Sequence, residues 1–259
     1  MAPAVAGISR RQHLLSFIFV LIVGLAAGTI SGIVGTGSSI MLMPILVYQY
    51  GPQQAVPIMA IAAVMANLSR ILAWWREVDW RACAAYSVTG IPAAALGART
   101  LLALPPHAVD ISIGLFLIAM VPVRHWLARH ELKLSLWHLA IGGAVIGYIT
   151  GIVVSTGPLS VPLFLFYGLT KGAFLATEAA SSLGLYVSKS VTFQQLGALT
   201  AETAIKGLIA GSSLMAGAFI AKRFVLRLEP DVFRLVMDGI MLVAGGAMLL
   251  NAFMAAPAS

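Results

Sequence analysis

Residues 35–44 read GTGSSIMLMP, and residues 155–162 read STGPLSVP. Each stretch interrupts an apolar run with small residues and ends in a proline. Glycine permits sharp turns and proline removes a helical hydrogen bond, so we expect a helix to break in both places. In a membrane, such a break opens helix ends whose backbone groups can meet a polar solute. The two breaks therefore predict a binding site.

The composition predicts an all-α polytopic membrane protein. Hydrophobic residues make up 60% of the 259 positions, and charged residues only 10%. Soluble domains carry about a quarter charged residues, and a soluble chain this apolar would expose large hydrophobic patches. Many uncharged runs approach the ~20 residues that cross a bilayer. The alternation of polar and apolar residues expected for a β-barrel is absent.

About eight transmembrane helices are expected along the chain. Their approximate positions are 14–34, 55–75, 82–102, 109–123, 136–154, 173–193, 203–221 and 232–253. Two short apolar pieces, 40–50 and 159–169, follow the breaks and are too short to cross a bilayer alone. We expect them to be half-helices.

Landmarks recur between the two halves of the chain. Pro44 matches Pro162 and Ala55 matches Ala173 at one constant offset. We therefore predict two homologous four-helix repeats, 1–127 and 135–259, joined by a cytoplasmic linker at 128–134. Each repeat would hold one broken helix and one half-helix, a common plan in secondary transporters. The repeats are parallel if the half-helices do not cross the membrane, and inverted if each counts as a crossing.

The net charge of +7 does not indicate nucleic-acid binding. The basic residues mostly flank the apolar runs, where they anchor and orient membrane helices. Arg10 and Arg11 precede the first span, and we interpret them as its cytoplasmic anchors rather than as part of a cleaved signal. The expected surroundings are a lipid bilayer, with no nucleic-acid partner.

The breaks carry the first candidate binding groups. A helix that starts after a break leaves its first N–H groups unpaired, and these attract anions. Hydroxyl groups add further donors. The candidates are Gly35, Thr36, Gly37, Ser38, Ser39, Ser155, Thr156 and Gly157, with Pro44, Pro158 and Pro162 as helix breaks. Two alternatives remain open. Small residues also allow close helix packing, the role expected of Gly28, Gly32, Gly147 and Gly151, and half-helix C-termini pointing inward would favour a cation or a neutral solute.

Ionisable residues inside a span are the second set of candidates, because they are costly in a membrane. Glu178 and Lys189 are eleven residues apart, about three helical turns, so they share a helix face. Glu178 is a candidate to carry a coupling proton or to pair with Lys189, and Lys189 could instead extend to the interface. Asn67 and Ser181 are further candidates for substrate binding, and Arg70 could anchor its span or bind an anion.

Several kinds of function lack support in the sequence. We find no P-loop, no nucleophile elbow and no metal-ligand spacing. We therefore expect neither an enzyme nor an ATP-driven pump, and no cofactor or metal. The single cysteine, Cys83, excludes an intramolecular disulfide.

The doubled motif resembles the sulfite exporter TauE/SafE family, also called the toluenesulfonate uptake permease superfamily. Each half of that family carries a pattern close to G-x-x-x-G-x-x-G-x-G-G-G-x-x-x-x-P. The matching residues here are Gly28, Gly32, Gly35, Gly37 and Pro44 in the first half, and Gly157, Pro158 and Pro162 in the second. Serines replace two of the glycines, at Ser38 and Ser39.

The resemblance implies a multi-pass carrier of the bacterial inner membrane. Its substrates would be small anions such as sulfite, sulfoacetate and other sulfonates, or related organic anions, and the carrier could be proton-coupled and form a homo-oligomer. The alternative is an anion channel lined by the two breaks.

Overall fold

The computed structural model describes residues 20–29, 38–129, 133–153, 156–169 and 171–224, and the pairs 238–239, 242–243, 245–246 and 249–250. Within these residues the regular structure is helical and contains no strand, as predicted. The first described helix is Val20–Thr29. The others are α2 (Ser38–Tyr50), α3 (Pro52–Trp74), the 3₁₀ turn η1 (Trp75–Glu77), α4 (Trp80–Ala103), α5 (Pro106–Ala128), α6 (Leu136–Ile152), α7 (Gly157–Phe166), α8 (Lys171–Gln195) and α9 (Ala201–Phe224).

Local sequence signals set several helix ends. The Asp79 carboxylate caps α4 by accepting hydrogen bonds from the N–H groups of Arg81 and Ala82, at 2.9 and 3.1 Å. Ser135 and His138 form a capping box at the start of α6. Before α3, Gly51 has a φ of 74° and turns the chain, and a proline then occupies the first turn of the helix. These ends lie close to the predicted boundaries of the spans.

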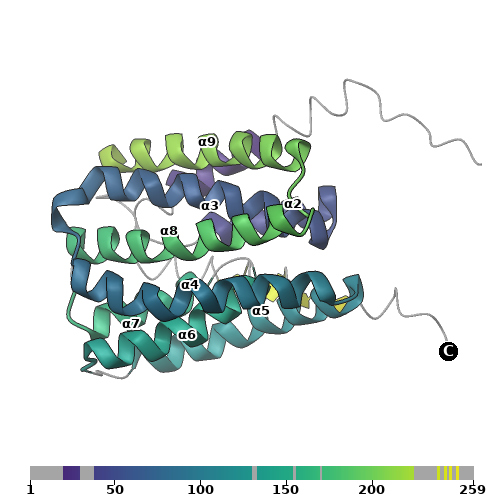
Figure 1. Ribbon diagram of the computed structural model, residues 1–259. Helices are drawn as coiled ribbons and strands as arrows, with labels where there is room; N and C mark the ends of the chain where they lie inside the picture. Colours follow the sequence, from purple (N-terminus) through teal and green to yellow (C-terminus); the bar gives the residue numbers. More distant parts are fainter. Residues whose placement is uncertain are drawn as a thin grey trace, which may run out of the picture.

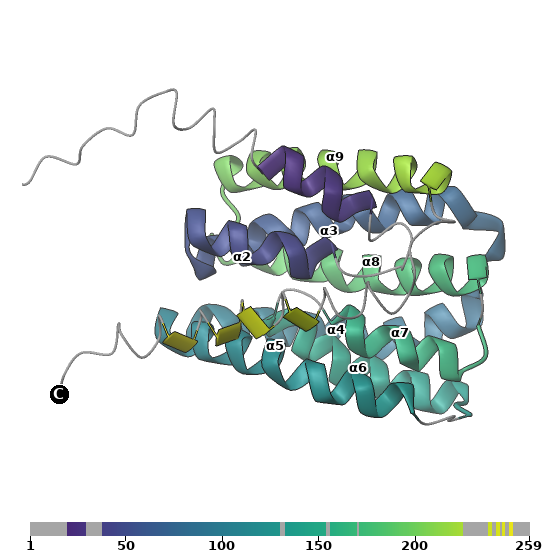
Figure 2. The same ribbon diagram turned by 180° about the vertical axis from the view of Figure 1, so that it is seen from behind.

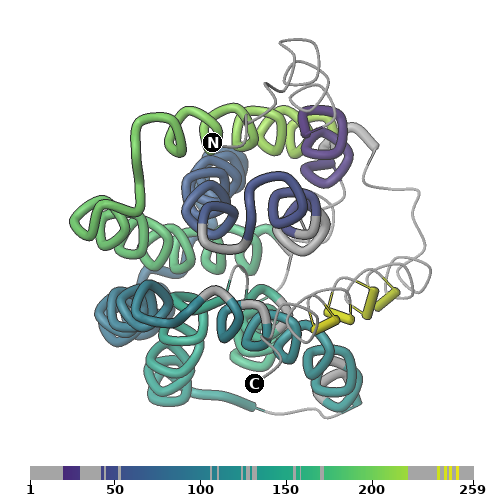
Figure 3. Tube along the Cα trace, turned by 90° about the vertical axis from the view of Figure 1, so that its right-hand side faces the viewer, coloured from purple at the N-terminus to yellow at the C-terminus, as the bar shows by residue number. Residues whose placement is uncertain are grey.

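The helices lie side by side in two groups (Figure 1). One group holds α3, α9 and α2, and the other holds α4, α5, α6 and α7, with α8 between them (Figures 1 and 2). The view from one end shows the two groups one above the other (Figure 3). The most extensive packing joins α4 to α6, and α3 to α9 and α8. The first helix of the second half therefore packs on a helix of the first half.

Glycines allow the closest of these contacts. A Cβ on Gly97 of α4 would lie 2.1 Å from the Tyr148 carbonyl oxygen of α6. One on Gly151 of α6 would lie 2.5 Å from the Ala94 carbonyl oxygen. The helix Val20–Thr29 approaches α9 in the same way, because a Cβ on Gly28 would lie 2.2 Å from the Leu214 carbonyl oxygen. The packing role expected of Gly28, Gly147 and Gly151 is thus confirmed, and Gly32 lies outside the described residues.

The contacts also fix the directions of the helices. Helices α3 and α9 run the same way, since Gly207 lies against Ile61 and Gly211 against Met65. Helices α3 and α8 run in opposite directions, since Gly172 at the start of α8 lies against Trp74 at the end of α3. Contacts of the same kind show that the helix Val20–Thr29 is parallel to α9, and that α4 and α6 are parallel to α8. Three pairs of helices that correspond in the predicted repeats therefore run in opposite directions: Val20–Thr29 and α6, α3 and α8, and α4 and α9.

Large apolar side chains are exposed on the surface, and many polar side chains are buried beside the apolar core. Exposed positions include Val88 and Trp137, at 73% and 70%, while fourteen polar or charged side chains of the described residues are buried. This pattern agrees with helices surrounded by lipid. By length and composition, two described segments could cross a membrane, Gln54–Glu77 and Ala201–Ile220, and three shorter apolar helices are Val20–Thr29, His107–Val123 and Leu136–Ile152. The count of eight spans stays a prediction, because most of 232–253 lies outside the described residues.

The glycine contacts predict a packing defect in the variant Gly151→Ala. Its new methyl group meets backbone atoms of α4, which cannot move aside as a side chain can. Forcing an extra carbon into a packed contact costs about 1–3 kcal/mol, which lowers the unfolding midpoint by roughly 2–10 °C. Thermal unfolding of the purified protein in detergent measures the shift.

Gly246→Ala is the matched control, because a Cβ at Gly246 meets no atom of the described residues within 4 Å. Equal midpoints for the two variants would show that α4 and α6 are not in close contact.

Candidate functional site

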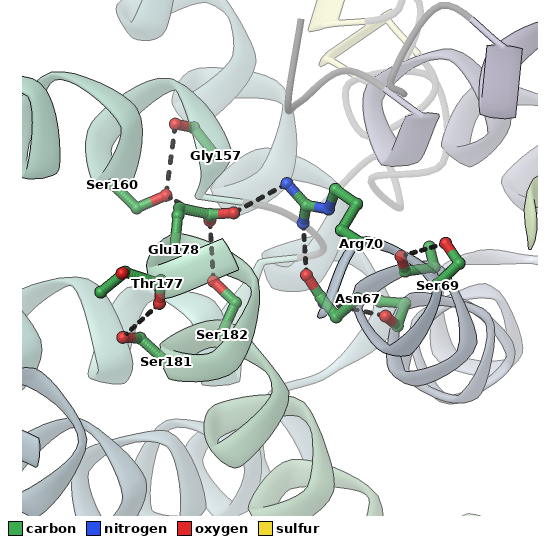
Figure 4. A network of polar contacts seen from close by, with 11 residues as sticks. Asn67, Ser69, Arg70, Gly157, Ser160, Thr177, Glu178, Ser181 and Ser182 are labelled. Carbon is green, nitrogen blue, oxygen red and sulfur yellow. Dashed lines mark hydrogen bonds and ion pairs between the residues drawn. The ribbon is translucent and has the colours of Figure 1, made fainter. Parts of the chain in front are cut away.

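The candidate site lies where α3 crosses α8, beside the start of α7 (Figure 4). Glu178 of α8 is at its centre and is only 2% exposed. Arg70 of α3 donates from Nη1 to its Oε2 at 2.8 Å. The hydroxyl groups of Ser160 in α7 and Ser182 in α8 both donate to Oε1, at 2.9 and 2.8 Å. Three helices thus supply the partners of one buried carboxylate.

Asn67 holds Arg70 in place. Its side-chain oxygen accepts a hydrogen bond from Arg70 Nη2, and its amide nitrogen donates to the Ala63 carbonyl oxygen at 2.8 Å. Asn67 is 2% exposed, so these bonds satisfy a polar group that water does not reach. An ion pair away from water is stable only when further hydrogen bonds satisfy both partners. Asn67, Ser160 and Ser182 provide those bonds.

The second break places the start of α7 against Glu178. Thr156 precedes the helix, and its hydroxyl bonds to the hydroxyl of Thr150 across the break. Pro158 occupies the first turn, as predicted, and Ser160 follows it. The far end of α7 lies at the surface loop, where the Phe166 carbonyl oxygen accepts from Leu134 N at 3.0 Å. The N-terminus of α7, with its partial positive charge, therefore points inward.

Lys189 satisfies the other side of the same break. Its ammonium donates to the carbonyl oxygens of Thr150 and Val153, at 2.6 and 2.8 Å, at the C-terminal end of α6. The side chain is 1% exposed, so it does not extend to the interface. The prediction that Lys189 is the charge partner of Glu178 is wrong in this structure. The partner is Arg70, because α3 crosses α8 at the level of Glu178, whereas Lys189 lies at the level of the α6 end.

Tyr86 of α4 is a residue that the sequence analysis missed. It is 0% exposed, and its ring packs on Phe164 of α7 with the centroids 5.2 Å apart. Its hydroxyl has no hydrogen-bond partner within the described residues. A buried hydroxyl without a partner is costly, which makes it a candidate donor to a bound solute. No sequence pattern distinguishes this tyrosine from an ordinary core residue.

The remaining predicted site residues fall into three groups. Ser38 and Ser39 are the first residues of α2, and Gly157 begins α7. Ser181 is fully buried, but its hydroxyl donates to the Thr177 carbonyl oxygen, and the neighbouring serine contacts Glu178 instead. Gly35, Thr36, Gly37 and Ser155 lie outside the described residues.

Pro44 and Pro162 do not break helices, contrary to the prediction. Pro44 lies inside α2 and Pro162 inside α7, and both helices continue beyond them. Each proline removes one helical hydrogen bond, and packed membrane helices tolerate that loss. Three longer helices also contain an internal proline, at Pro57, Pro92 and Pro122. Helix α7 instead begins at Gly157, directly after Thr156, and the small residues at 35–37 and 155 lie outside the described residues.

Among the described residues, no group of three or more His, Cys, Asp or Glu could hold a metal ion. The arrangement joins a permanent cation, a carboxylate that can take up a proton and a helix N-terminus.

Comparison with known proteins gives consistent matches. The family model described as "Sulfite exporter TauE/SafE" matches residues 20–248. "Probable membrane transporter protein YjnA" of Bacillus subtilis is 23% identical over 87% of this chain and 97% of its own length. "Probable membrane transporter protein y4hK" of Sinorhizobium fredii is 27% identical over 65% of this chain and 71% of its own length. No solved structure matches.

The Arg70–Glu178 pair predicts strong coupling in a double-mutant cycle. Arg70→Met leaves a buried carboxylate without its cation and should cost about 3–5 kcal/mol of stability. Adding Glu178→Met removes that carboxylate and should restore most of the loss. Unfolding of the two single variants and the double variant, by heat or denaturant in detergent, measures the coupling.

The control pair is Lys206 and Glu202, which lie 2.6 Å apart with the Glu202 side chain 77% exposed. Lys206→Met should cost less than about 1 kcal/mol. Additive effects of the Arg70 and Glu178 substitutions would contradict the pairing.

Proposed function

Because this chain belongs to the sulfite exporter TauE/SafE family, we propose that it is a proton-coupled secondary transporter of small anions. Its cargo would be sulfite, sulfonates such as sulfoacetate, or related organic anions, bound between the two broken helices. The observation that carries the proposal is the buried Arg70–Glu178 pair beside the start of α7.

The chemistry of that pair suits exchange between two anions. Arginine stays charged and binds planar or tetrahedral oxyanions through parallel N–H groups. Sulfite, a sulfonate or a carboxylate offers the same kind of oxygen acceptors as the Glu178 side chain. Protonation of Glu178 would release Arg70 for the substrate, and the Ser160 and Ser182 hydroxyls would still bond the neutral acid. One anion and one proton would then move together.

The direction of α7 supports an anion over a cation or a neutral solute. The helix starts inside the protein and ends at the surface, so its N–H groups and not its carbonyls face the site. An inward helix N-terminus makes an anion the better guest.

The opposed helix directions support inverted rather than parallel repeats. We propose eight spans in two halves, 1–127 and 135–259, with a linker at 128–134 and the site near the middle of the bilayer. Inverted repeats with discontinuous helices are common in carriers that alternate access between two sides. The proposed location is the bacterial inner membrane, and the bilayer and the anion are the expected partners.

A flux assay tests the substrate class. Proteoliposomes containing the purified protein should accumulate sulfite, sulfoacetate or a small carboxylate when the pH is lower outside than inside. Arg70→Lys should raise the KM about tenfold or more, because the compact lysine cannot form two parallel hydrogen bonds. Absence of flux for every anion in the wild-type protein would refute the proposal.

The variant Glu178→Gln separates a carrier from a channel. Glutamine keeps the acceptor for Ser160 and Ser182 but cannot take up a proton. A proton-coupled carrier should lose pH-driven accumulation while still exchanging labelled for unlabelled anion. Glu202→Gln, at an exposed position, should behave as wild type. Conduction that depends on voltage alone and is unchanged in Glu178→Gln would favour the channel.

A further inference from the structure

At the C-terminal end of α6, the ammonium group of Lys189 occupies a position that would suit a bound cation. Helix α6 ends at Ile152. Its last carbonyl groups therefore have no following helical turn whose N–H groups could donate hydrogen bonds to them. Inside a membrane no water replaces those donors, so each open carbonyl is costly. Two of the carbonyls, of Thr150 and Val153, converge on the Lys189 ammonium at 2.6 and 2.8 Å.

The surroundings of Lys189 are those of a bound cation and not of a salt bridge. Within the described residues, the ammonium donates to backbone carbonyls, and the Phe193 ring centroid lies 5.6 Å away. Carbonyl oxygens and an aromatic face attract a cation without neutralising its charge. The C-terminal end of α6 contributes a partial negative charge. A buried ammonium with neutral ligands is expensive, so its presence here needs a cause.

Transporters with broken helices suggest an explanation for this buried ammonium. In such proteins, unwound carbonyls and half-helix C-termini coordinate the coupling cation, often Na⁺. The end of α6 has the same elements, but a covalently attached ammonium occupies the place of the ion. Eleven residues earlier on α8, Glu178 faces the start of α7. Helix α8 therefore gives each side of the break a charge of opposite sign.

We propose that Lys189 is an internal substitute for a coupling cation, and that its removal opens a site for a small monovalent cation at the end of α6. In the wild-type protein this position never empties, so binding and transport need no Na⁺. The statement about transport rests on the function proposed above. The statement about the site does not, because it concerns the folded protein alone.

The test compares two substitutions in the purified full-length protein. Lys189→Ala leaves the carbonyls open and leaves room for an ion. Lys189→Met leaves them open but fills the room with an apolar chain of similar length. Unfolding midpoints are measured in NaCl, KCl or methylammonium chloride, at constant ionic strength against N-methyl-D-glucamine chloride, whose cation is too large for the site.

We expect both variants to unfold at a lower temperature than wild type in N-methyl-D-glucamine. At saturating concentrations, at least one small cation should raise the midpoint of Lys189→Ala by about 5–10 °C, the shift expected near one hundred times Kd. The same cations should not raise the midpoint of Lys189→Met or of wild type. Lys206→Ala, which removes a lysine whose partner Glu202 is 77% exposed, controls for the loss of charge.

Two results would overturn the proposal. One is a Lys189→Ala midpoint that does not respond to any of the cations, or that responds no more than Lys189→Met. The other is a wild-type protein that Na⁺ stabilises specifically, a measurement that decides the matter even if Lys189→Ala does not fold. Because neither readout needs transport, a failure here is separate from a failure of the flux assay.

Discussion

A helix interrupted inside a membrane leaves a partially negative end and a partially positive end, neither of which water can solvate. The rest of this site depends on how the protein satisfies those two ends. Lys189 accounts for the carbonyl end of α6, and Glu178 lies against the N-terminal end of α7. Both come from one face of α8, so a single helix supplies a charged side chain to each of the two helix ends.

Arg70 changes the balance of charge at this point. Glu178 already lies beside a helix N-terminus, and the guanidinium adds a second positive partner to the same carboxylate. Arg70 and Lys189 are basic and Glu178 is acidic, and this excess of basic groups is consistent with the anionic substrate proposed above. The buried Tyr86 hydroxyl, which lacks a partner within the described residues, adds an uncharged donor nearby.

The packing of the helices explains why the site needs both halves of the chain. Glycine contacts join α6 of the second half to α4 of the first, and the helix Val20–Thr29 of the first half to α9 of the second. Helix α3 crosses α8 between these two contacts. The halves are therefore interleaved, and each half supplies packing surfaces for the other. A small shift between the halves would act directly on the Arg70–Glu178 contact, which joins residues 108 positions apart.

The sequence by itself determined the membrane environment and the helices and charged residues from which the site is built. Composition alone indicated membrane helices, because the bilayer tolerates so few charges, and the small-residue stretches indicated short helices at about 40–50 and 159–169, where the structure has α2 and α7. The spacing of Glu178 and Lys189 correctly placed them on one face, because helical periodicity is local. The partners of Glu178 and Lys189 lie far away along the chain, so only the tertiary structure determined them. Glu178 pairs with Arg70 and Lys189 with the end of α6 because the helices run in directions that no single span reveals. Pro44 and Pro162 were misread for a related reason, since surrounding helices can stabilise a helix that contains a proline.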